Sequence, residues 1–323
     1  MIDFQNVSFS YGEESSGGGI RNVNLTINTG EFVLLTGESG CGKTTITRLV
    51  NGLVPHYYEG NLEGDVLLDG KSVSDTPLYD LAAMVGSVFQ NPKSQFFNVD
   101  TDSELAFACE NLGYPQEDIL KRIDRTVSDY HIEDLMGRSV FALSGGEKQK
   151  IACASSSVLL PGIMVLDEPS SNLDMAAIDD LRQVLSLWKK QGKTILIAEH
   201  RLYYLHDLAD RVLYVKDGEI EREYTPAEFD SLSDGTRKEM GLRPFSLSKL
   251  KPANQYQAHT AKQMEFQNFC FAYKKREPES LHIPSAELPV GETIAIIGLN
   301  GAGKSTLARC ICCLLYTSPS PRD

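Results

Sequence analysis

Two glycine-rich segments have the residue types and spacing of a phosphate-binding loop. Gly37, Gly42, Lys43 and Thr44 in GESGCGKTT fit the pattern G-x-x-x-x-G-K-[ST], and GLNGAGKST (298–306) repeats it. Backbone N–H groups of such a loop converge on phosphate oxygens, and the lysine reaches the terminal phosphates. The alternative is an ordinary glycine-rich turn, which the presence of two copies disfavours.

A pair of adjacent carboxylates could support phosphoryl transfer. Asp167 and Glu168 end the apolar run IMVLDE. One carboxylate can hold Mg²⁺, directly or through water, while its neighbour faces a water molecule as base or orienter. Phosphoryl transfer needs that division of labour. The alternative is a solvated acidic turn, which the four apolar residues before the pair and the upstream loop disfavour.

These residues must be positioned by strands that end at one edge of a sheet. The apolar runs EFVLLT and TIAIIG precede the two loops, AAMVGSVFQ ends on Gln90, and KTILIAEH ends on His200. Short apolar strands that alternate with helices predict an α/β fold whose mostly parallel sheet is covered on both faces. Its ligand would lie at the carboxyl ends of the strands, where Gly37, Asp167 and His200 fall.

The segments between these strands predict two smaller subdomains. GDVLLDGKSV is typical of a short antiparallel strand pair, and residues 92–143 are more polar with a helical period. In LSGGEKQK (143–150), Ser144 and Glu147 predict a capping box, and Gly145 and Gly146 permit close backbone approach. From the residues alone, this segment is either a well-capped helix or a second phosphate-binding helix start.

The chain contains an internal duplication. IDFQNVSFSY (2–11) resembles MEFQNFCFAY (264–273), at a spacing far longer than a solenoid repeat. We therefore expect a domain over 1–223, a linker over 224–262 and the start of a second copy over 263–312. The last segment, CLLYTSPSPRD (313–323), resembles translated adapter sequence, so we expect a non-native tail, with a natural regulatory tail as the alternative.

Composition restricts the classes of function. The formal net charge is −13 without a Lys/Arg-rich run, which disfavours a nucleic-acid partner. No apolar stretch approaches about 18 residues, so we expect no membrane span. The first residues, MIDFQNVSF, lack a basic and apolar leader, so we expect no export.

Residues 1 to about 223 resemble the ATP-binding-cassette (ABC) ATPases of the P-loop NTPase class. GESGCGKTT is similar to their Walker A loop, IMVLDE to Walker B, LSGGEKQ to the signature motif and SNLD (171–174) to the D-loop. Gln90 matches their Q-loop, His200 their switch histidine and Tyr11 the aromatic residue that stacks on adenine. The resemblance implies ATP and Mg²⁺ as ligands, and a cassette with an antiparallel β subdomain and a helical subdomain.

Site residues follow from these matches. The resemblance implies catalytic roles for Glu168, His200 and Gln90, and Mg²⁺ contacts for Thr44, Gln90 and Asp167. In this family each ATP lies between the Walker loop of one cassette and the signature helix of another, so Ser144 and Gly146 would touch a γ-phosphate held by a different cassette. The nucleotide-contacting residues implied are Tyr11, Gly37, Ser39, Gly40, Cys41, Gly42, Lys43, Thr44, Thr45, Ser144, Gly145, Gly146, Asp174, Tyr273, Gly298, Gly301, Gly303, Lys304, Ser305 and Thr306.

A narrower resemblance is to the ATPases of energy-coupling factor (ECF) importers, which drive uptake of vitamins or transition-metal ions. QNPKSQFFNVDTDSELAFACENLG and AEHRLYYL carry it. It implies a peripheral protein on the cytoplasmic face of a prokaryotic membrane, partnered by a membrane-embedded coupling subunit that docks on the segment after Gln90, and by a substrate-binding subunit. The alternative is a soluble ABC ATPase of translation or DNA repair, which the acidic charge and the short linker of mixed charge disfavour.

The second copy has a P-loop but no counterpart of Gln90, LSGGEKQ, Asp167 or His200. We therefore expect a truncated second cassette, and neither composite site can be completed within this chain. ATP binding is the firmer expectation, and turnover would need first cassettes to pair between molecules.

Overall fold

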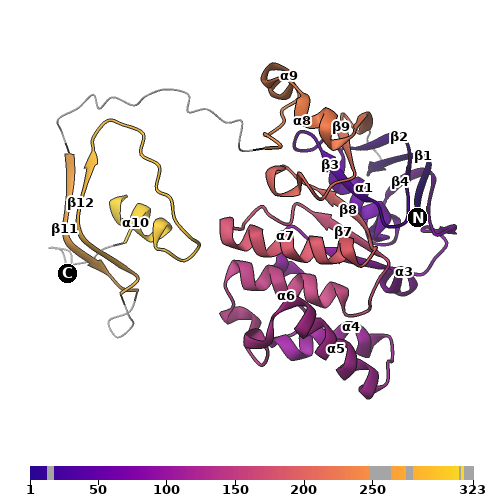
Figure 1. Cartoon of the computed structure of the whole chain (residues 1–323), viewed down its shortest axis with the longest axis horizontal. Helices are drawn as coiled ribbons and strands as arrows, with labels where there is room; N and C mark the ends of the chain where they lie inside the picture. The colour runs from indigo at the N-terminus through magenta and orange to yellow at the C-terminus, as the bar shows by residue number, and fades with distance from the viewer. Residues whose placement is uncertain (13–17, 247–262, 274–278, 313, 316–323) are drawn as a thin grey trace. The chain divides into compact units, whose positions relative to one another are not determined.

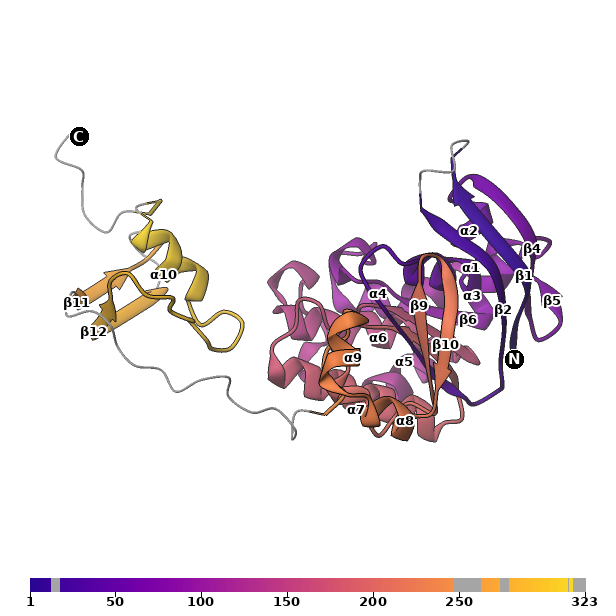
Figure 2. The same cartoon turned by 90° about the horizontal axis from the view of Figure 1, so that it is seen from above.

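The computed structural model describes residues 1–12, 18–246, 263–273, 279–312 and 314–315. The chain divides into two compact units, Met1–Leu250 and Lys251–Asp323 (Figures 1 and 2). Each unit is described by itself below.

A six-stranded sheet forms the centre of the first unit. Its order is β10-β9-β3-β8-β7-β6, and every neighbouring pair is parallel except β10 with β9. The mostly parallel sheet predicted from the sequence is thus confirmed. The strands are β3 (Phe32–Thr36), β6 (Val85–Val88), β7 (Ile163–Asp167), β8 (Thr194–Ala198), β9 (Arg211–Lys216) and β10 (Glu219–Tyr224).

These strands are apolar along their length because both faces of the sheet are covered. In β3, Phe32 and Leu34 join one core cluster, whereas Val33 and Leu35 join the other. The first cluster includes residues of α6 (Gly145–Ser157) and α7 (Met175–Lys190), and the second includes residues of α1 (Lys43–Val50) and the antiparallel sheet. Alternate side chains of each strand therefore pack on opposite layers.

An antiparallel sheet of order β2-β1-β4-β5 forms the predicted β subdomain. The turn between β4 and β5 is Asp69-Gly70, and both residues have positive φ, as a two-residue hairpin turn requires. Helix α2 (Leu53–His56) follows α1, and helix α3 (Leu78–Met84) follows β5. The strands are β1 (Ile2–Tyr11), β2 (Gly19–Ile27), β4 (Gly60–Leu68) and β5 (Lys71–Ser72).

Residues 92–143 form the predicted helical subdomain, with α4 (Thr101–Asn111), α5 (Gln116–Tyr130) and short 3₁₀ turns η1 (Pro92–Ser94), η2 (Glu133–Leu135) and η3 (Val140–Ala142). A buried polar network ties this subdomain to the sheet layer. Tyr130 donates to Ser157 Oγ over 2.6 Å, and Trp188 Nε1 donates to the Tyr130 hydroxyl. The three residues join α5, α6 and α7, the last of which packs on β8.

The first unit extends beyond residue 223, where the sequence predicts a linker to begin. Residues after β10 form α8 (Pro226–Ser231) and α9 (Asp234–Glu239). Earlier in the same unit, a 3₁₀ turn, η4 (Tyr203–Leu205), lies between β8 and β9. Phe229 and Phe245 are fully buried in the same core cluster as Phe32, with their ring centroids 5.3 Å apart. Burial of two aromatic rings places 226–246 in the folded unit.

The second unit contains β11 (Gln263–Phe271), β12 (Leu281–Pro289) and α10 (Lys304–Ile311). The strands pair antiparallel, as β1 and β2 do. The run TIAIIG (293–298), predicted as a strand, is not one in the structure, and Ile297 is 90% exposed. A strand needs a hydrogen-bonded neighbour, and within the described residues none pairs with this run. In neither unit does a described helix have the length and apolarity needed to cross a membrane.

Candidate nucleotide-binding site

The first glycine-rich loop joins β3 to α1 and presents a helix N-terminus without a side-chain cap. Gly37 has φ 148°, and a Cβ there would lie 2.1 Å from Val215 O, so only glycine fits. Gly42 is the N-cap of α1 in left-handed conformation, and the first helical hydrogen bond runs from Ile46 N to Gly42 O. The backbone N–H groups that come before Ile46, including that of Lys43, therefore lie ahead of the first hydrogen bond of the helix. Such N–H groups can donate to an anion.

Lys43 lies folded across this loop with its side chain buried. Its ammonium donates to Gly37 O over 3.0 Å and to Glu38 O over 2.8 Å. Cys41 is buried behind the loop, whereas Ser39 and Gly40 are exposed at its tip. A buried cation held by two neutral carbonyls can exchange them for phosphate oxygens, so the donor set fits an ATP polyphosphate.

Thr44, in the first turn of α1, lies beside Asp167, the last residue of β7. Thr44 Oγ1 donates to Asp167 Oδ1 over 3.1 Å. Burial raises the pKa of Asp167 above its ordinary value, and the Thr44 hydroxyl offsets part of that rise. A hard oxygen pair whose carboxylate is desolvated fits Mg²⁺, which would restore the charge compensation that burial removes.

Glu168 is contacted by both other predicted catalytic residues. Gln90 Nε2 donates to Glu168 Oε2 over 3.0 Å, and His200 Nε2 lies 3.1 Å from Oε1 in ion-pair range. His200 Nε2 nevertheless has no partner of hydrogen-bond geometry among the described atoms. Burial and the Lys43 ammonium lower the pKa of His200, and the carboxylates of Glu168 and Glu199 offset part of that lowering. Gln90, also predicted as a metal ligand, is placed by the structure on Glu168 and not on the Thr44–Asp167 pair.

Tyr11 lies beside the first turns of α1. Its hydroxyl is 3.3 Å from Thr45 Oγ1 and accepts from Arg48 Nη1 over 3.0 Å. Arg48 also lies over the Tyr58 ring, 4.0 Å from the centroid. The sequence does not single out Arg48 or Tyr58, although Arg48 follows Thr44 by one helical turn and could have been placed near the loop on that spacing.

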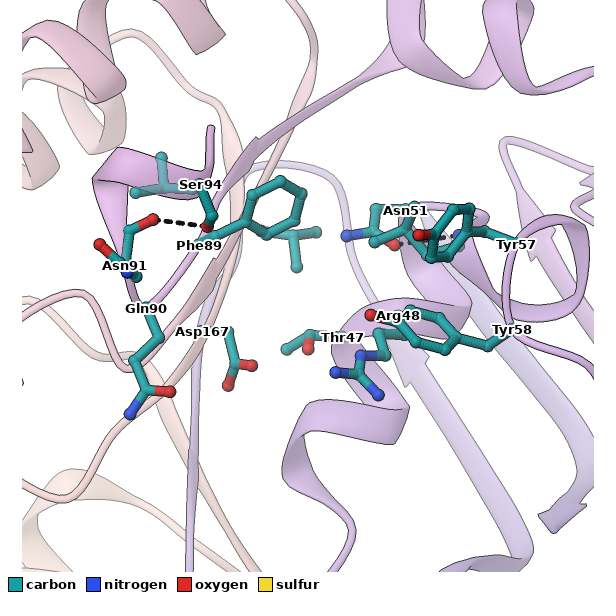
Figure 3. A pocket seen from close by; sticks show the side chains of 13 residues that line it. Thr47, Arg48, Asn51, Tyr57, Tyr58, Phe89, Gln90, Asn91, Ser94 and Asp167 are labelled. Carbon is teal, nitrogen blue, oxygen red and sulfur yellow. Dashed lines mark hydrogen bonds between the residues drawn. The ribbon is translucent and has the colours of Figure 1, made fainter. Parts of the chain in front are cut away.

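A cleft of about 460 Å³ opens between α1 and the segment that follows β6. In Figure 3, Arg48 and Tyr58 line one side, Gln90 and Asn91 line the other, and Asp167 lies between them. Because β6 ends at Val88, Gln90 belongs to the loop beyond the strand. The same loop thus lines the cleft and contacts Glu168.

The signature segment starts α6 as predicted. Glu147 N donates to Ser144 Oγ over 3.3 Å and Ser144 N donates to Glu147 Oε2 over 2.7 Å, which confirms the capping box. Gly146 faces α7, where an added Cβ would lie 2.8 Å from that of Ala177. Asp174 accepts from Ala177 N over 3.0 Å as the N-cap of α7. In the described part of the chain, no hydrogen bond joins Ser144 or Gly145 to the first glycine-rich loop.

The second glycine-rich loop has the local geometry of the first. Lys304 Nζ donates to Gly298 O over 2.9 Å and to Leu299 O over 2.6 Å, as Lys43 does in its own loop. Gly303 is the left-handed N-cap of α10, whose first turn contains Ser305, and Gly301 also has positive φ. The Tyr273 hydroxyl lies 3.1 Å from Thr306 Oγ1, which repeats the contact of Tyr11 with Thr45.

Comparisons with known proteins agree with this geometry. Residues 20–171 and 281–319 match a family profile described as ABC transporter. A Treponema denticola protein described as an ABC transporter ATP-binding protein is 44% identical over 317 residues, which cover 97% of this chain and 64% of that protein. A Pyrococcus abyssi protein with the same description is 40% identical over 229 residues, covering 71% of this chain and 81% of that protein. The chain therefore spans less than two thirds of the length of the Treponema relative.

Two solved structures are similar to the chain. One is cbiO1 from Clostridium perfringens, described as part of the ABC transporter complex cbiONQ, with TM-score 0.63 and 27% identity over 73% of this chain and 93% of that chain. The other is a dimeric ATP-binding cassette, MJ0796, in a post-hydrolysis state bound to ADP and Pi. Its TM-score is 0.61 and its identity 26%, over 70% of this chain and 99% of that chain.

Proposed function

The chain belongs to the ABC transporter family, and from that premise we propose that it binds and hydrolyses ATP as the energising subunit of a membrane importer. The observation that carries the proposal is the convergence at one sheet edge of a buried loop lysine, the Thr44–Asp167 pair and the Glu168–His200 pair. Phosphoryl transfer requires a cationic cradle, a metal-binding oxygen pair and a water-orienting carboxylate, and these residues match that set.

Each group has a task that follows from its contacts. The ammonium of Lys43 would exchange its two carbonyl partners for phosphate oxygens. Thr44 and Asp167 would hold Mg²⁺, which when bound neutralises developing charge on the phosphates. Glu168 would orient the attacking water and accept its proton. Gln90 donates to one oxygen of Glu168 and His200 Nε2 lies close to the other, and a carboxylate, which has about four lone-pair sites, can still accept from water beside them.

We propose that the site is completed by another cassette. Ser144, Gly145 and Gly146 form a capped helix start with no hydrogen bond to the loop of their own unit in the described residues, which supports a role toward a nucleotide held elsewhere. The dimeric arrangement of MJ0796 supports pairing of this kind. The second unit would be part of a second cassette, because its loop repeats the lysine contacts of the first and the family profile matches it from residue 281.

The proposed importer is of the ECF type, for vitamin or transition-metal ion uptake. The likeness to cbiO1, part of a cbiONQ complex, supports this assignment. The segment after Gln90 would dock on a membrane-embedded coupling subunit, to which the exposed side chains of Phe97 (75%) and Val99 (64%) would offer apolar contact area. A substrate-binding subunit would complete the importer, and the chain would lie on the cytoplasmic face of a prokaryotic membrane.

The test is ATP hydrolysis by the full chain, measured as a function of its concentration. Pairing between molecules predicts that the rate rises faster than linearly, because two copies build each site. Isothermal titration with Mg-ATP is measured in parallel. Absence of Mg-ATP binding would overturn the proposal, and a rate strictly proportional to concentration would contradict the pairing.

A further inference from the structure

The carboxylate of Glu199 is buried and accepts four hydrogen bonds between three segments of the site. Glu199 directly follows β8 and is 1% exposed. Its Oε1 accepts from Ser170 N over 3.0 Å and from the Tyr204 hydroxyl over 2.9 Å. Its Oε2 accepts from His200 N over 2.7 Å and from Arg201 N over 2.9 Å. One side chain thus joins the backbone at His200 to the backbone that follows Glu168.

Arg201 contacts the same backbone farther along. Its Nη1 donates to Leu173 O over 2.9 Å, and its Nη2 lies 3.5 Å from Ser171 O. The residues on either side of His200 therefore hold an N–H group and a carbonyl of one short segment, 170–173. The Ser170 N–H group bonds a carboxylate and the Leu173 carbonyl bonds a guanidinium. Hydrogen bonds with a charged partner are stronger than ordinary backbone hydrogen bonds.

The segment from Glu168 to Asp174 needs such support because its first residue, Glu168, is in a disfavoured conformation. Glu168 has φ 43°, in the left-handed region that non-glycine residues rarely adopt and that persists only where the surroundings impose it. Glu168 N donates to Ala198 O over 2.9 Å, and Ser171 N donates to Glu168 O over 3.2 Å. Glu199 N in turn donates to Leu35 O over 3.0 Å, so the support is anchored in the central sheet.

We propose that Glu199 and Arg201 are positioning residues that hold segment 168–174 in the geometry in which the Glu168 carboxylate meets His200. The proposal rests on the proposed ATPase function for its catalytic consequence. Its structural consequence, a rigid segment between the carboxylate pair and α7, is independent of hydrolysis.

The first experiment measures hydrogen exchange of peptides that cover residues 168–174 in the full chain. Glu199→Gln keeps the side-chain volume but turns an amide NH₂ toward N–H or O–H donors, and Arg201→Gln removes the guanidinium. Both variants should exchange at least about tenfold faster in this segment. The control is Glu117→Gln, an exposed glutamate of α5, which should leave the segment unchanged. Unchanged exchange in both test variants would overturn the proposal.

The second experiment separates turnover from binding. We expect kcat to fall by about tenfold or more in Glu199→Gln and Arg201→Gln, because small misplacements of a reacting group are costly, while the Kd and stoichiometry for Mg-ATP stay within about threefold. A proportional loss of kcat and bound sites would indicate partial unfolding and overturn the positioning role. If Glu199→Gln does not fold, Arg201→Gln decides both experiments. If the unaltered chain binds Mg-ATP without hydrolysing it, the proposed turnover fails and hydrogen exchange alone decides the positioning role.

Discussion

His200 Nε2 lies 3.1 Å from Glu168 Oε1, and the two residues follow the neighbouring parallel strands β8 and β7. The other oxygen of Glu168 accepts from Gln90, beyond the next strand of the sheet. Three strand ends therefore converge on one carboxylate. This convergence makes Glu168 the side chain whose replacement most directly separates nucleotide binding from turnover.

Glu168→Gln should abolish hydrolysis while Mg-ATP binding persists. The amide keeps the size of the carboxylate but cannot accept a proton from water, and loss of a general base costs about 10²- to 10⁴-fold in rate. Size-exclusion chromatography with Mg-ATP should show a dimer trapped in this variant. Hydrolysis at the unaltered rate would remove Glu168 from the proposed role.

The stability of the nucleotide-free protein should decline below about pH 6.5, the ordinary His pKa, through His200. Burial and Lys43 lower the pKa of His200, so on acidification the unfolded chain takes up this proton before the folded protein does. The His200 contribution is thus present above the unfolded pKa and is lost as pH falls through the folded pKa. His200→Gln does not titrate and serves as the reference.

The measurement is the free energy of unfolding in urea for both proteins from pH 7.5 to 5. The free energy of unfolding of the wild type minus that of His200→Gln should decrease as pH falls. A difference that stays constant over this range would show that the folded and unfolded pKa values of His200 are equal.

Periodicity and strand-end reasoning predicted much of the site. Continuous apolar runs predicted β3, β7 and β8, and the rule that ligands lie where parallel strands end predicted one sheet edge for Gly37, Asp167 and His200, which lie at or just after the ends of these strands. The contacts of Arg48 and Glu199 could not be predicted in this way. They depend on which backbone carbonyls and N–H groups a side chain reaches, and that is set by tertiary packing.

Two predictions from the sequence differ from the structure, and both differences arise from contacts between segments that are distant in the sequence. TIAIIG has the composition of a strand, but strand formation depends on a paired neighbour that the described residues do not supply. Residues 224–246 have the mixed charge of a linker, yet Thr225 and Glu228 form a capping box that starts α8 and could have been recognised. Burial of Phe229 and Phe245 depends on an apolar surface that lies elsewhere in the sequence.

Lys43→Ala should weaken Mg-ATP binding by roughly 10- to 150-fold. Hydrogen bonds to charged groups contribute about 1.5–3 kcal/mol, which corresponds to that range of affinity. The matched control is Lys304→Ala in the second loop, which lacks a counterpart of the Thr44–Asp167 pair among the described residues. Calorimetric titration of both variants should show the larger loss for Lys43, and equal losses would contradict the assignment of the first loop as the main site.

Phe245→Ala should destabilise the first unit by about 3–5 kcal/mol, the usual cost of removing a buried aromatic ring. Phe245 is fully buried against Phe229, in the segment that the sequence predicts as a linker. Phe141→Ala is the matched control, because Phe141 is 76% exposed and its loss should change stability by less than about 0.5 kcal/mol. Urea denaturation of both variants measures the difference. Equal stability of the two would mean that 226–246 does not contribute to the fold and that the unit ends near residue 223.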